Sequence, residues 1–340
     1  MDIQGLKATA NAMVAPGKGV LAADESTGTM TKRLQSIGVE STEDSRRRWR
    51  QLLFTAEGIG DWISGVIMYD ETIRQSTDDG TSFVKVLEAQ GVISGIKVDT
   101  GAKPLAGAPG ESVTEGLDGL RERLAEYREL GARFTKWRAV IAIGDGIPSP
   151  YCISVNAHAL ARYAALVQEA GLVPIVEPEV LMDGSHSIQR CAEVTDATLH
   201  AVFAELHAQR VLLEGIVLKP NMVLSGKDAA DRASPEEVAE ATIACFRRTV
   251  PAAVPGIAFL SGGQGDEEAT VNLDALNRRA DGLPWQLTFS YGRGLQATPL
   301  AKWAGQASNV GPAQEAFQVR ARETAAARRG EYAQALGAAV

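Results

Sequence analysis

The sequence has few of the residues from which metal and disulfide sites are built. Among 340 residues there are 3 cysteines and 4 histidines. Cys152, Cys191 and Cys245 lie far apart with no Cys-x-x-Cys pair, which excludes a disulfide framework and a thiolate metal site. His200 and His207 share one expected helix at seven-residue spacing, farther apart than the usual ligands of a zinc site. We therefore expect no metal and no other cofactor.

Long apolar runs and an excess of basic charge are also missing. No apolar stretch reaches the roughly 18–20 residues that span a bilayer, and the N-terminal one is too short for a signal peptide. The formal net charge is −8, from 34 Lys and Arg against 42 Asp and Glu, whereas nucleic-acid and anionic-membrane surfaces carry a basic footprint. The sequence therefore predicts a cytoplasmic protein with no nucleic-acid and no membrane partner.

Short apolar runs recur along the whole chain, each followed by a longer stretch with helical spacing. They are nearly continuous in apolar residues, as strands buried on both faces should be. Eight such alternations predict parallel pairing and, most simply, an α/β fold that closes into a (β/α)₈ barrel, also called a TIM barrel. An open doubly wound sheet would normally carry Gly-x-Gly-x-x-Gly after its first strand, where this chain has DESTGT. The runs are 19–24, 64–70, 94–99, 134–143, 172–180, 214–222, 256–264 and 285–292.

Several helices show their ends in the sequence. Apolar residues repeat at three and four positions through 115–131, and Gly131 can end that helix. Ser234-Pro235-Glu236-Glu237 offers a capping hydroxyl, a proline at the first helical position and a carboxylate at the third. Residues 296–340 are rich in Ala, Gln, Glu and Arg, which predicts one or two extra C-terminal helices and a short mobile tail. We expect one domain over residues 1–340.

Ionisable residues interrupt the apolar runs at a regular interval. Lys97, Lys136, Glu177, Lys219 and Ser261 follow one another at steps of 39, 41, 42 and 42 residues, about one strand–helix unit each. Equal steps place these side chains at similar heights on successive strands, and barrel chemistry lies where the C-terminal ends of the strands meet. Unpaired buried charges are costly, so the alternative is a set of ion pairs that only fills the interior. We interpret the cluster as a site. Asp24, Glu179, Ser290 and Arg293 lie at similar places on the first, fifth and eighth runs.

The lysines suggest covalent chemistry. A nucleophilic amine must lose its proton, and burial or neighbouring cations lower a lysine pKa from about 10.4. We expect Lys97 and Lys136 to supply that repulsion to Lys219, which would then attack a carbonyl and form a Schiff base. Glu177 or Glu179 would shuttle protons during dehydration. A carboxylate at the first strand could also accept a proton from a substrate hydroxyl.

Two glycine-rich loops suggest phosphate binding. SGGQG (261–265) follows the seventh strand and SYGRG (290–294) follows the eighth, where barrel enzymes often hold phosphate. Glycines let backbone N–H groups approach an anion, and Arg293 can add a two-pronged clamp. Each loop alone could be an ordinary tight turn. Lys32 and Arg33 could hold a second phosphate, although alone they are typical of solvated surface charge.

Seven strings of the sequence closely resemble class I fructose-1,6-bisphosphate aldolase. The likeness runs in order from about Pro16 to Tyr332. The resemblance implies reversible cleavage of fructose 1,6-bisphosphate to dihydroxyacetone phosphate and glyceraldehyde 3-phosphate, in glycolysis and gluconeogenesis. It also implies a metal-independent lysine Schiff base and a homotetramer. The strings are LAADESTGT (21–29), GIKVDTG (95–101), FTKWR (134–138), VPIVEPEVLMDG (173–184), EGIVLKPNMV (214–223), FLSGGQ (259–264) and FSYGRGLQ (289–296).

Matching the motifs residue by residue assigns roles that the resemblance implies. Lys219 resembles the Schiff-base lysine, and Glu177 the principal acid/base with Glu179 as its supporting carboxylate. Asp24 matches the aspartate implicated in carbon–carbon cleavage, with Lys136 and Lys97 as the assisting lysines. The implied 1-phosphate site comprises Ser261, Gly262, Gly263, Ser290, Gly292 and Arg293. The implied 6-phosphate site comprises Ser26, Thr29, Lys32 and Arg33, and Arg138 is an expected ion-pair partner in the mouth.

The C-terminus departs from the family pattern. Animal members end in a longer tail whose terminal tyrosine aids proton exchange on the enamine, whereas the last tyrosine here is Tyr332. Another group or water then performs the exchange, or the step is slower. Two other functions compete with the aldolase prediction. One is a different Schiff-base sugar-phosphate enzyme, such as a transaldolase-like barrel, and the other is a non-catalytic scaffold barrel.

Overall fold

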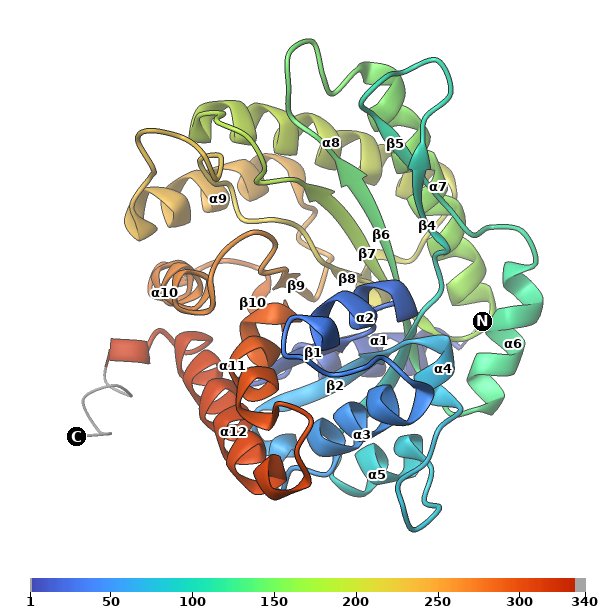
Figure 1. The fold of residues 1–340 in the computed structure, drawn as a ribbon. Coiled ribbons are helices and arrows are strands. Elements are labelled where there is room, and N and C mark those ends of the chain that lie inside the picture. Colours follow the sequence, from blue (N-terminus) through green and yellow to red (C-terminus); the bar gives the residue numbers. More distant parts are fainter. Residues whose placement is uncertain (1, 334–340) are drawn as a thin grey trace.

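The structure, a computed structural model, describes residues 2–333, and its centre is a closed barrel of eight parallel strands. The strands follow one another around the barrel in the order β1-β10-β9-β8-β7-β6-β3-β2, which confirms the predicted (β/α)₈ fold (Figure 1). The tail expected to be mobile, residues 334–340, lies outside the described residues. The barrel strands are β1 Gly19–Ala23, β2 Ile63–Met68, β3 Ile93–Lys97, β6 Phe134–Ile141, β7 Val173–Val180, β8 Val217–Leu218, β9 Gly256–Phe259 and β10 Gln286–Tyr291.

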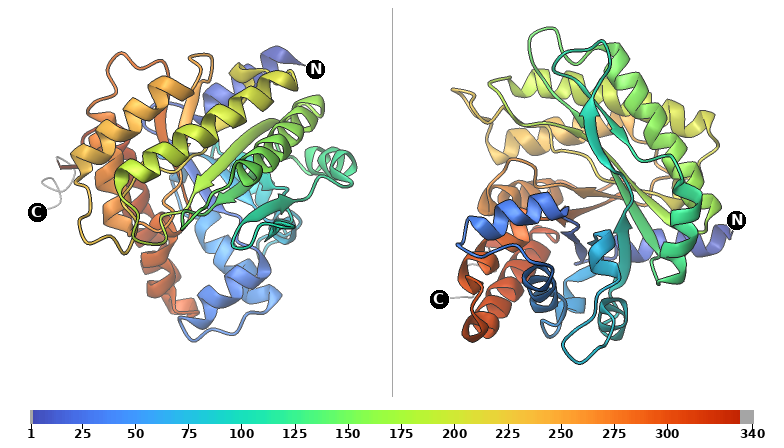
Figure 2. Two further views of the ribbon diagram at one scale, coloured as in Figure 1. Left: turned by 90° about the horizontal axis from the view of Figure 1, so that it is seen from above. Right: turned by 45° about the vertical axis from the view of Figure 1, so that its right-hand side comes forward.

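Helices surround the barrel and shield the outer face of its strands (Figures 1 and 2). Every residue of β1, β2 and β7 is buried, as expected for strands covered on both faces. The larger apolar core lies between the strands and this helical layer and contains Trp49, Trp137 and Trp303. The principal surrounding helices are α2 Thr27–Gln35, α3 Glu43–Phe54, α5 Phe83–Ala89, α6 Leu120–Glu129, α7 Pro150–Glu169, α8 Ile188–Ala208, α9 Pro235–Thr249, α10 Asp266–Asn277 and α11 Arg293–Trp303.

The N-terminal helix α1, Ile3–Met13, covers one end of the barrel. Its buried residues join an apolar cluster with Phe134, Val173 and Val217, which lie at the starts of their strands. The Phe134 ring needs the space left by a glycine, because a Cβ on Gly95 would lie 2.3 Å from its ring carbons. The N-terminal end of the barrel is therefore apolar and packed, which leaves the C-terminal end for chemistry.

Two segments differ from the expectation. The stretch after β3 forms an antiparallel hairpin, β4 Gly101–Pro104 and β5 Ser112–Glu115, which the sequence did not reveal. Helix α6 begins at Leu120 instead of near 115, because Gly116 and Gly119 have φ values of +131° and +62°. Those left-handed conformations are incompatible with a helix and easily adopted by glycine.

The C-terminal segment forms helices, as predicted. Helix α12, Val310–Ala327, packs against α10 and α11, and the three lie together in Figure 1. The start of α9 has the expected capping box between Ser234 and Glu237. Among the described residues, no helix is long and apolar enough to cross a membrane.

Candidate active site

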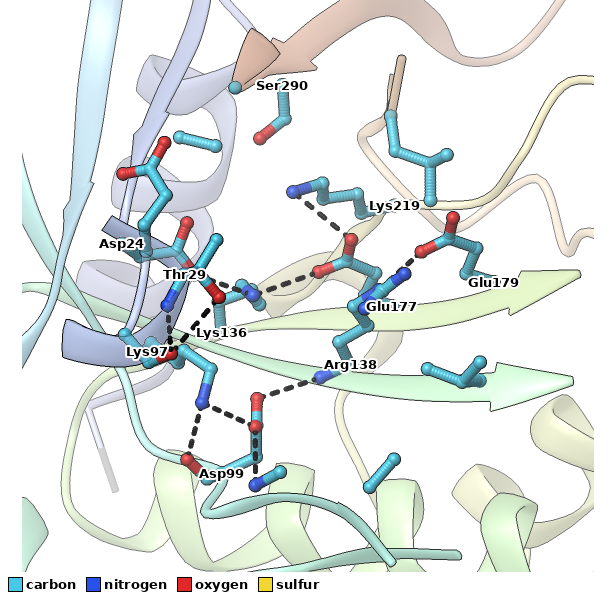
Figure 3. Close-up of a pocket in the computed structure, with 18 of the residues that line it drawn as sticks. Asp24, Thr29, Lys97, Asp99, Lys136, Arg138, Glu177, Glu179, Lys219 and Ser290 are labelled. Atoms are coloured by element: carbon cyan, nitrogen blue, oxygen red, sulfur yellow. Dashed lines mark hydrogen bonds and ion pairs between the residues drawn. The ribbon is translucent and has the colours of Figure 1, made fainter. Parts of the chain in front are cut away.

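A cavity of about 770 Å³ opens at the C-terminal ends of the barrel strands. Its lining brings together residues that are hundreds of positions apart in the sequence, and Figure 3 shows the charged part of it. Of the residues predicted for the site, only Lys32 does not line this cavity; it is exposed on α2. The predicted residues that line it are Asp24, Ser26, Thr29, Arg33, Lys97, Lys136, Arg138, Glu177, Glu179, Lys219, Ser261, Gly262, Gly263, Ser290, Gly292 and Arg293.

The strand register explains why the regular spacing in the sequence brings the charged side chains together. Lys97 on β3 lies directly opposite Lys136 on β6, and the next pair of strands aligns Arg138 with Glu177. The backbone N–H of Lys219 donates to the carbonyl of Val176 on the neighbouring strand, at 2.8 Å. Successive strands thus bring the predicted charged side chains to one level.

Lys136 lies between two carboxylates at the centre of the cavity. Its Nζ is 2.6 Å from Asp24 Oδ2 and 3.5 Å from Glu177 Oε2. Burial lowers the pKa of the Lys136 amine, but the charges of Asp24, Glu177 and Asp99 outweigh burial and leave that pKa above its usual value. Lys136 is therefore a fixed cation at neutral pH, and a poor nucleophile.

Asp24 is the carboxylate most strongly held in its charged form. Burial raises its pKa, but the charges of Lys136, Lys219 and Lys97, with the hydrogen bond from Lys136, outweigh burial and lower the pKa to about 2. The carboxylate is thus ionised at neutral pH and can accept a hydrogen bond from a substrate hydroxyl.

Two further ion pairs flank this centre. Lys97 Nζ lies 2.6 Å from Asp99 Oδ1 and donates to the Asp99 carbonyl at 2.7 Å. The Asp99 carboxylate also accepts the backbone N–H of Arg138 at 3.2 Å, and the Arg138 side chain pairs with Glu179. These contacts, all visible in Figure 3, fix the orientation of the side chains around the cavity.

Lys219 differs from the other two lysines in its contacts. It is 4% exposed, and its Nζ lies 3.2 Å from Glu177 Oε1, its one ion-pair partner within the described chain. The other two ammonium groups lie 2.6 Å from their carboxylates. The repulsion expected from Lys97 and Lys136 is weakened by those carboxylates, whereas the Lys219–Glu177 contact provides a direct acceptor for the Lys219 proton.

The glycine-rich loops line the cavity at the ends of β9 and β10, and each precedes a helix. Gly262, with φ of +55°, lies in the loop before α10, and Gly292 caps α11. The Arg293 guanidinium donates to the Gly262 carbonyl and so joins the two loops. Ser290 Oγ is buried in the lining and, within residues 2–333, has no hydrogen-bond partner. Of these two helix N-termini, that of α11 lines the cavity, where it and the Ser290 hydroxyl are available to an anion.

Helix α2 supplies a third N-terminus at the rim. Ser26 caps it by accepting from the Thr29 backbone N–H at 3.4 Å. The Arg33 side chain pairs with Glu25, and its Nη2 lies 4.0 Å from where a Cβ on Gly292 would be. Arg33 therefore lies beside the loop that follows β10.

Comparisons with known proteins agree with this geometry. The sequence model of the family described as "Fructose-bisphosphate aldolase class-I" matches residues 5–339. This chain belongs to the class I fructose-bisphosphate aldolase family. The predicted family, fold and lyase activity are thereby confirmed.

Individual aldolases are similar over nearly their whole length. A "probable fructose-bisphosphate aldolase class 1" of Xanthomonas axonopodis pv. citri is 57% identical, over 98% of this chain and 99% of its own. "Fructose-bisphosphate aldolase 6, cytosolic" of Arabidopsis thaliana is 55% identical, over 93% of this chain and 88% of its own. The solved aldolase of Plasmodium falciparum, in complex with TRAP and a small-molecule inhibitor, superposes with a TM-score of 0.95 at 47% identity, covering 97% and 95% of the two chains.

Among the carboxylates of this aldolase site that sequence reasoning missed, two pair with predicted cations. Asp99 fixes Lys97, and Glu25 holds Arg33 together with the buried Arg50, whose Nη2 lies 2.7 Å from Glu25 Oε2. Both lie inside quoted strings, two residues after Lys97 and one after Asp24. Their proximity to a predicted cation could have identified them.

The histidines and cysteines lie apart from the aldolase chemistry. Cys152, Cys191 and Cys245 are free and buried, and His200 is exposed on α8. No group of three or more His, Cys, Asp or Glu side chains among residues 2–333 is arranged to hold a metal ion.

Proposed function

We propose that Lys219 forms the Schiff base through which this aldolase reversibly cleaves fructose 1,6-bisphosphate. The observation that carries the assignment is the contrast among the three cavity lysines that lie at the ends of barrel strands, Lys97, Lys136 and Lys219. Lys97 and Lys136 are each held 2.6 Å from a carboxylate, whereas the Lys219 amine lies 3.2 Å from Glu177. The amine that is not held at short distance by a carboxylate is the one freest to turn toward a carbonyl carbon, and Glu177 lies beside it as a proton acceptor.

Glu177 is the proposed acid and base of the Schiff-base steps. Its Oε1 faces Lys219 Nζ at 3.2 Å, so it can accept the ammonium proton before Lys219 attacks the C2 ketone. The same carboxyl can then return a proton to the leaving carbinolamine hydroxyl, which departs as water. Glu179, held by Arg138, is the proposed supporting carboxylate.

Carbon–carbon cleavage requires that the C4 hydroxyl lose its proton while electrons flow to the iminium nitrogen. Asp24, ionised and bonded to Lys136 at 2.6 Å, is proposed to accept the proton of that hydroxyl. Lys136 connects Asp24 with Glu177, and Lys97 adds positive charge to the same group. The cleavage releases glyceraldehyde 3-phosphate, and hydrolysis of the enamine releases dihydroxyacetone phosphate.

The two loops and helix α2 are the proposed phosphate sites. Ser261, Gly262, Gly263, Ser290, Gly292 and Arg293 line the cavity at the N-termini of α10 and α11, and we assign them to the 1-phosphate. Ser26, Thr29 and Arg33 line it from α2, and we assign them to the 6-phosphate. A phosphate at each of these two sites would hold the ketose beside the lysines.

Relative turnover of three substrates, with EDTA present, tests the substrate assignment. We expect fructose 1,6-bisphosphate to be cleaved more efficiently than fructose 1-phosphate, because the latter lacks the contact with α2. Sedoheptulose 1,7-bisphosphate provides the comparison with a longer sugar. Negligible cleavage of fructose 1,6-bisphosphate, or a strict need for added metal, would contradict the proposal.

We also propose a cytoplasmic location, a homotetrameric assembly and a single domain over residues 1–340. The Arabidopsis relative is named cytosolic, and the assembly rests on the family resemblance. Sedimentation equilibrium of the purified protein would give the number of subunits.

A further inference from the structure

The buried side chain of Arg320, on helix α12, is not part of the cavity but reaches the backbone at the starts of the two helices that follow the phosphate loops. Its guanidinium Nη2 donates to the Asp266 carbonyl at 3.1 Å and to the Gly294 carbonyl at 3.2 Å. Nη2 also lies 2.8 Å from Thr270 Oγ1, and Nε donates to the Gly294 carbonyl at 3.3 Å. The residue is only 8% exposed.

These partners lie in the first two turns of the two helices that follow the loops. Asp266 is the first residue of α10, directly after SGGQG, and Thr270 lies one turn later, whereas Gly294 is the second residue of α11. The loops come from different strand–helix units and are joined on the cavity side by the bond from Arg293 to the Gly262 carbonyl. Arg320 joins the same two segments from the other side.

The chemistry of the Arg320 guanidinium suits a position between two backbone segments. A guanidinium carries five donors in one plane, so it can bond several carbonyls at once, whereas an ammonium is a single point of charge. The remaining nitrogen, Nη1, pairs with Glu323 on the same helix at 2.7 Å. The side chain is therefore held by its own helix while it holds the two loops.

We propose that Arg320 is a positioning residue for the 1-phosphate: it fixes the starts of α10 and α11 relative to one another, and with them the two cavity-lining loops that precede these helices. This gives the C-terminal helix α12 a part in substrate binding without contact with substrate. The inference rests on the proposed assignment of the 1-phosphate to these loops.

The test compares a ligand that carries the phosphate with one that lacks it. Borohydride reduction traps the Schiff base, and the concentration of dihydroxyacetone phosphate or of dihydroxyacetone that gives half-maximal trapping is measured. For Arg320→Lys we expect that concentration to rise about tenfold for the phosphate, because charge-assisted bonds are strong ones, and to stay within about twofold for dihydroxyacetone.

A milder variant and a matched control accompany it. Thr270→Val removes one acceptor of Arg320, and we expect a smaller change in the same direction, about threefold. Arg322→Lys makes the same substitution on an exposed residue of the same helix, and we expect wild-type values for both ligands.

Two results would overturn the inference. One is wild-type affinity of Arg320→Lys for dihydroxyacetone phosphate; the other is an equal loss for both ligands, which would indicate only a structural role. The Arg293→Ala variant distinguishes failure of the inference about Arg320 from failure of the 1-phosphate assignment. If that variant also binds dihydroxyacetone phosphate normally, the assignment of the loops is wrong; if it binds weakly while Arg320→Lys does not, only the inference fails.

Discussion

The two sides of the cavity are built in different ways. On one side, charged side chains project from β3, β6, β7 and β8 and are buried in pairs, such as Lys136 with Asp24. On the other, glycine-rich loops and helix N-termini offer backbone N–H groups, together with the exposed Arg293. Covalent chemistry needs side chains whose charge and position are fixed before substrate arrives. A phosphate dianion needs many donors at an open surface. The comparison predicts that changes on the strand side lower kcat and changes on the loop side raise KM.

The substitution expected to have the largest effect, and the strongest test of the strand side, is Lys219→Met. Removing the amine removes the covalent step, and Lys97 and Lys136 are each held by a carboxylate, so we expect kcat to fall by about a thousandfold or more. Steady-state cleavage of fructose 1,6-bisphosphate measures it. Turnover near the wild-type rate would mean that another group carries the chemistry.

Lys136→Met should have the next largest effect. It removes the cation that lies between Asp24 and Glu177. We expect kcat to fall by about a hundredfold or more, as when a preorganised charge is lost from an active site. Leaving buried carboxylates with fewer partners should also lower the free energy of unfolding by about 3 kcal/mol. Urea unfolding measures the second effect, and an unchanged midpoint would show that the pair contributes little.

The loop side is tested by Arg293→Ala. We expect KM for fructose 1,6-bisphosphate to rise about tenfold with kcat less affected, because the variant loses a charge-assisted contact with the phosphate. Inorganic phosphate should inhibit the variant less strongly than the wild type. Should KM stay the same, Arg293 would not belong to the phosphate site.

The smallest expected effect is the pH dependence of the contribution that Asp24 makes to the free energy of unfolding. The folded state lowers its pKa from 3.8 to about 2, so its ionised form contributes stability above pH 4 that is lost as the pH falls through 2. By linkage this amounts to about 2 kcal/mol. The difference in unfolding free energy between wild type and Asp24→Asn should therefore shrink between pH 5 and pH 2. A constant difference would contradict the lowered pKa.

The barrel and its charged level could be predicted because both depend on local pattern and spacing. The buried runs identify the strands. The length of one strand–helix unit sets each interval in the series Lys97, Lys136, Glu177 and Lys219. The pairing of those charges could not be predicted. Asp24 and Lys136 meet because β1 and β6 face the same cavity, and the sequence gives no distance across a barrel.

Other differences have local causes. Lys32 and Arg33 are neighbours on α2, about 100° apart around the helix axis, so when Arg33 faces the cavity Lys32 points to solvent. The hairpin of β4 and β5 was missed because its strands are only four residues long and β4 is largely exposed. Such strands lack the apolar alternation by which a strand is recognised.

The most direct test of the central claim is to reduce the wild-type protein with borohydride in the presence of dihydroxyacetone phosphate, digest it, and locate the adduct by mass spectrometry. The account predicts a single modified peptide containing Lys219, with no adduct in Lys219→Met. An adduct on Lys136 or Lys97 with Lys219 unmodified would contradict it.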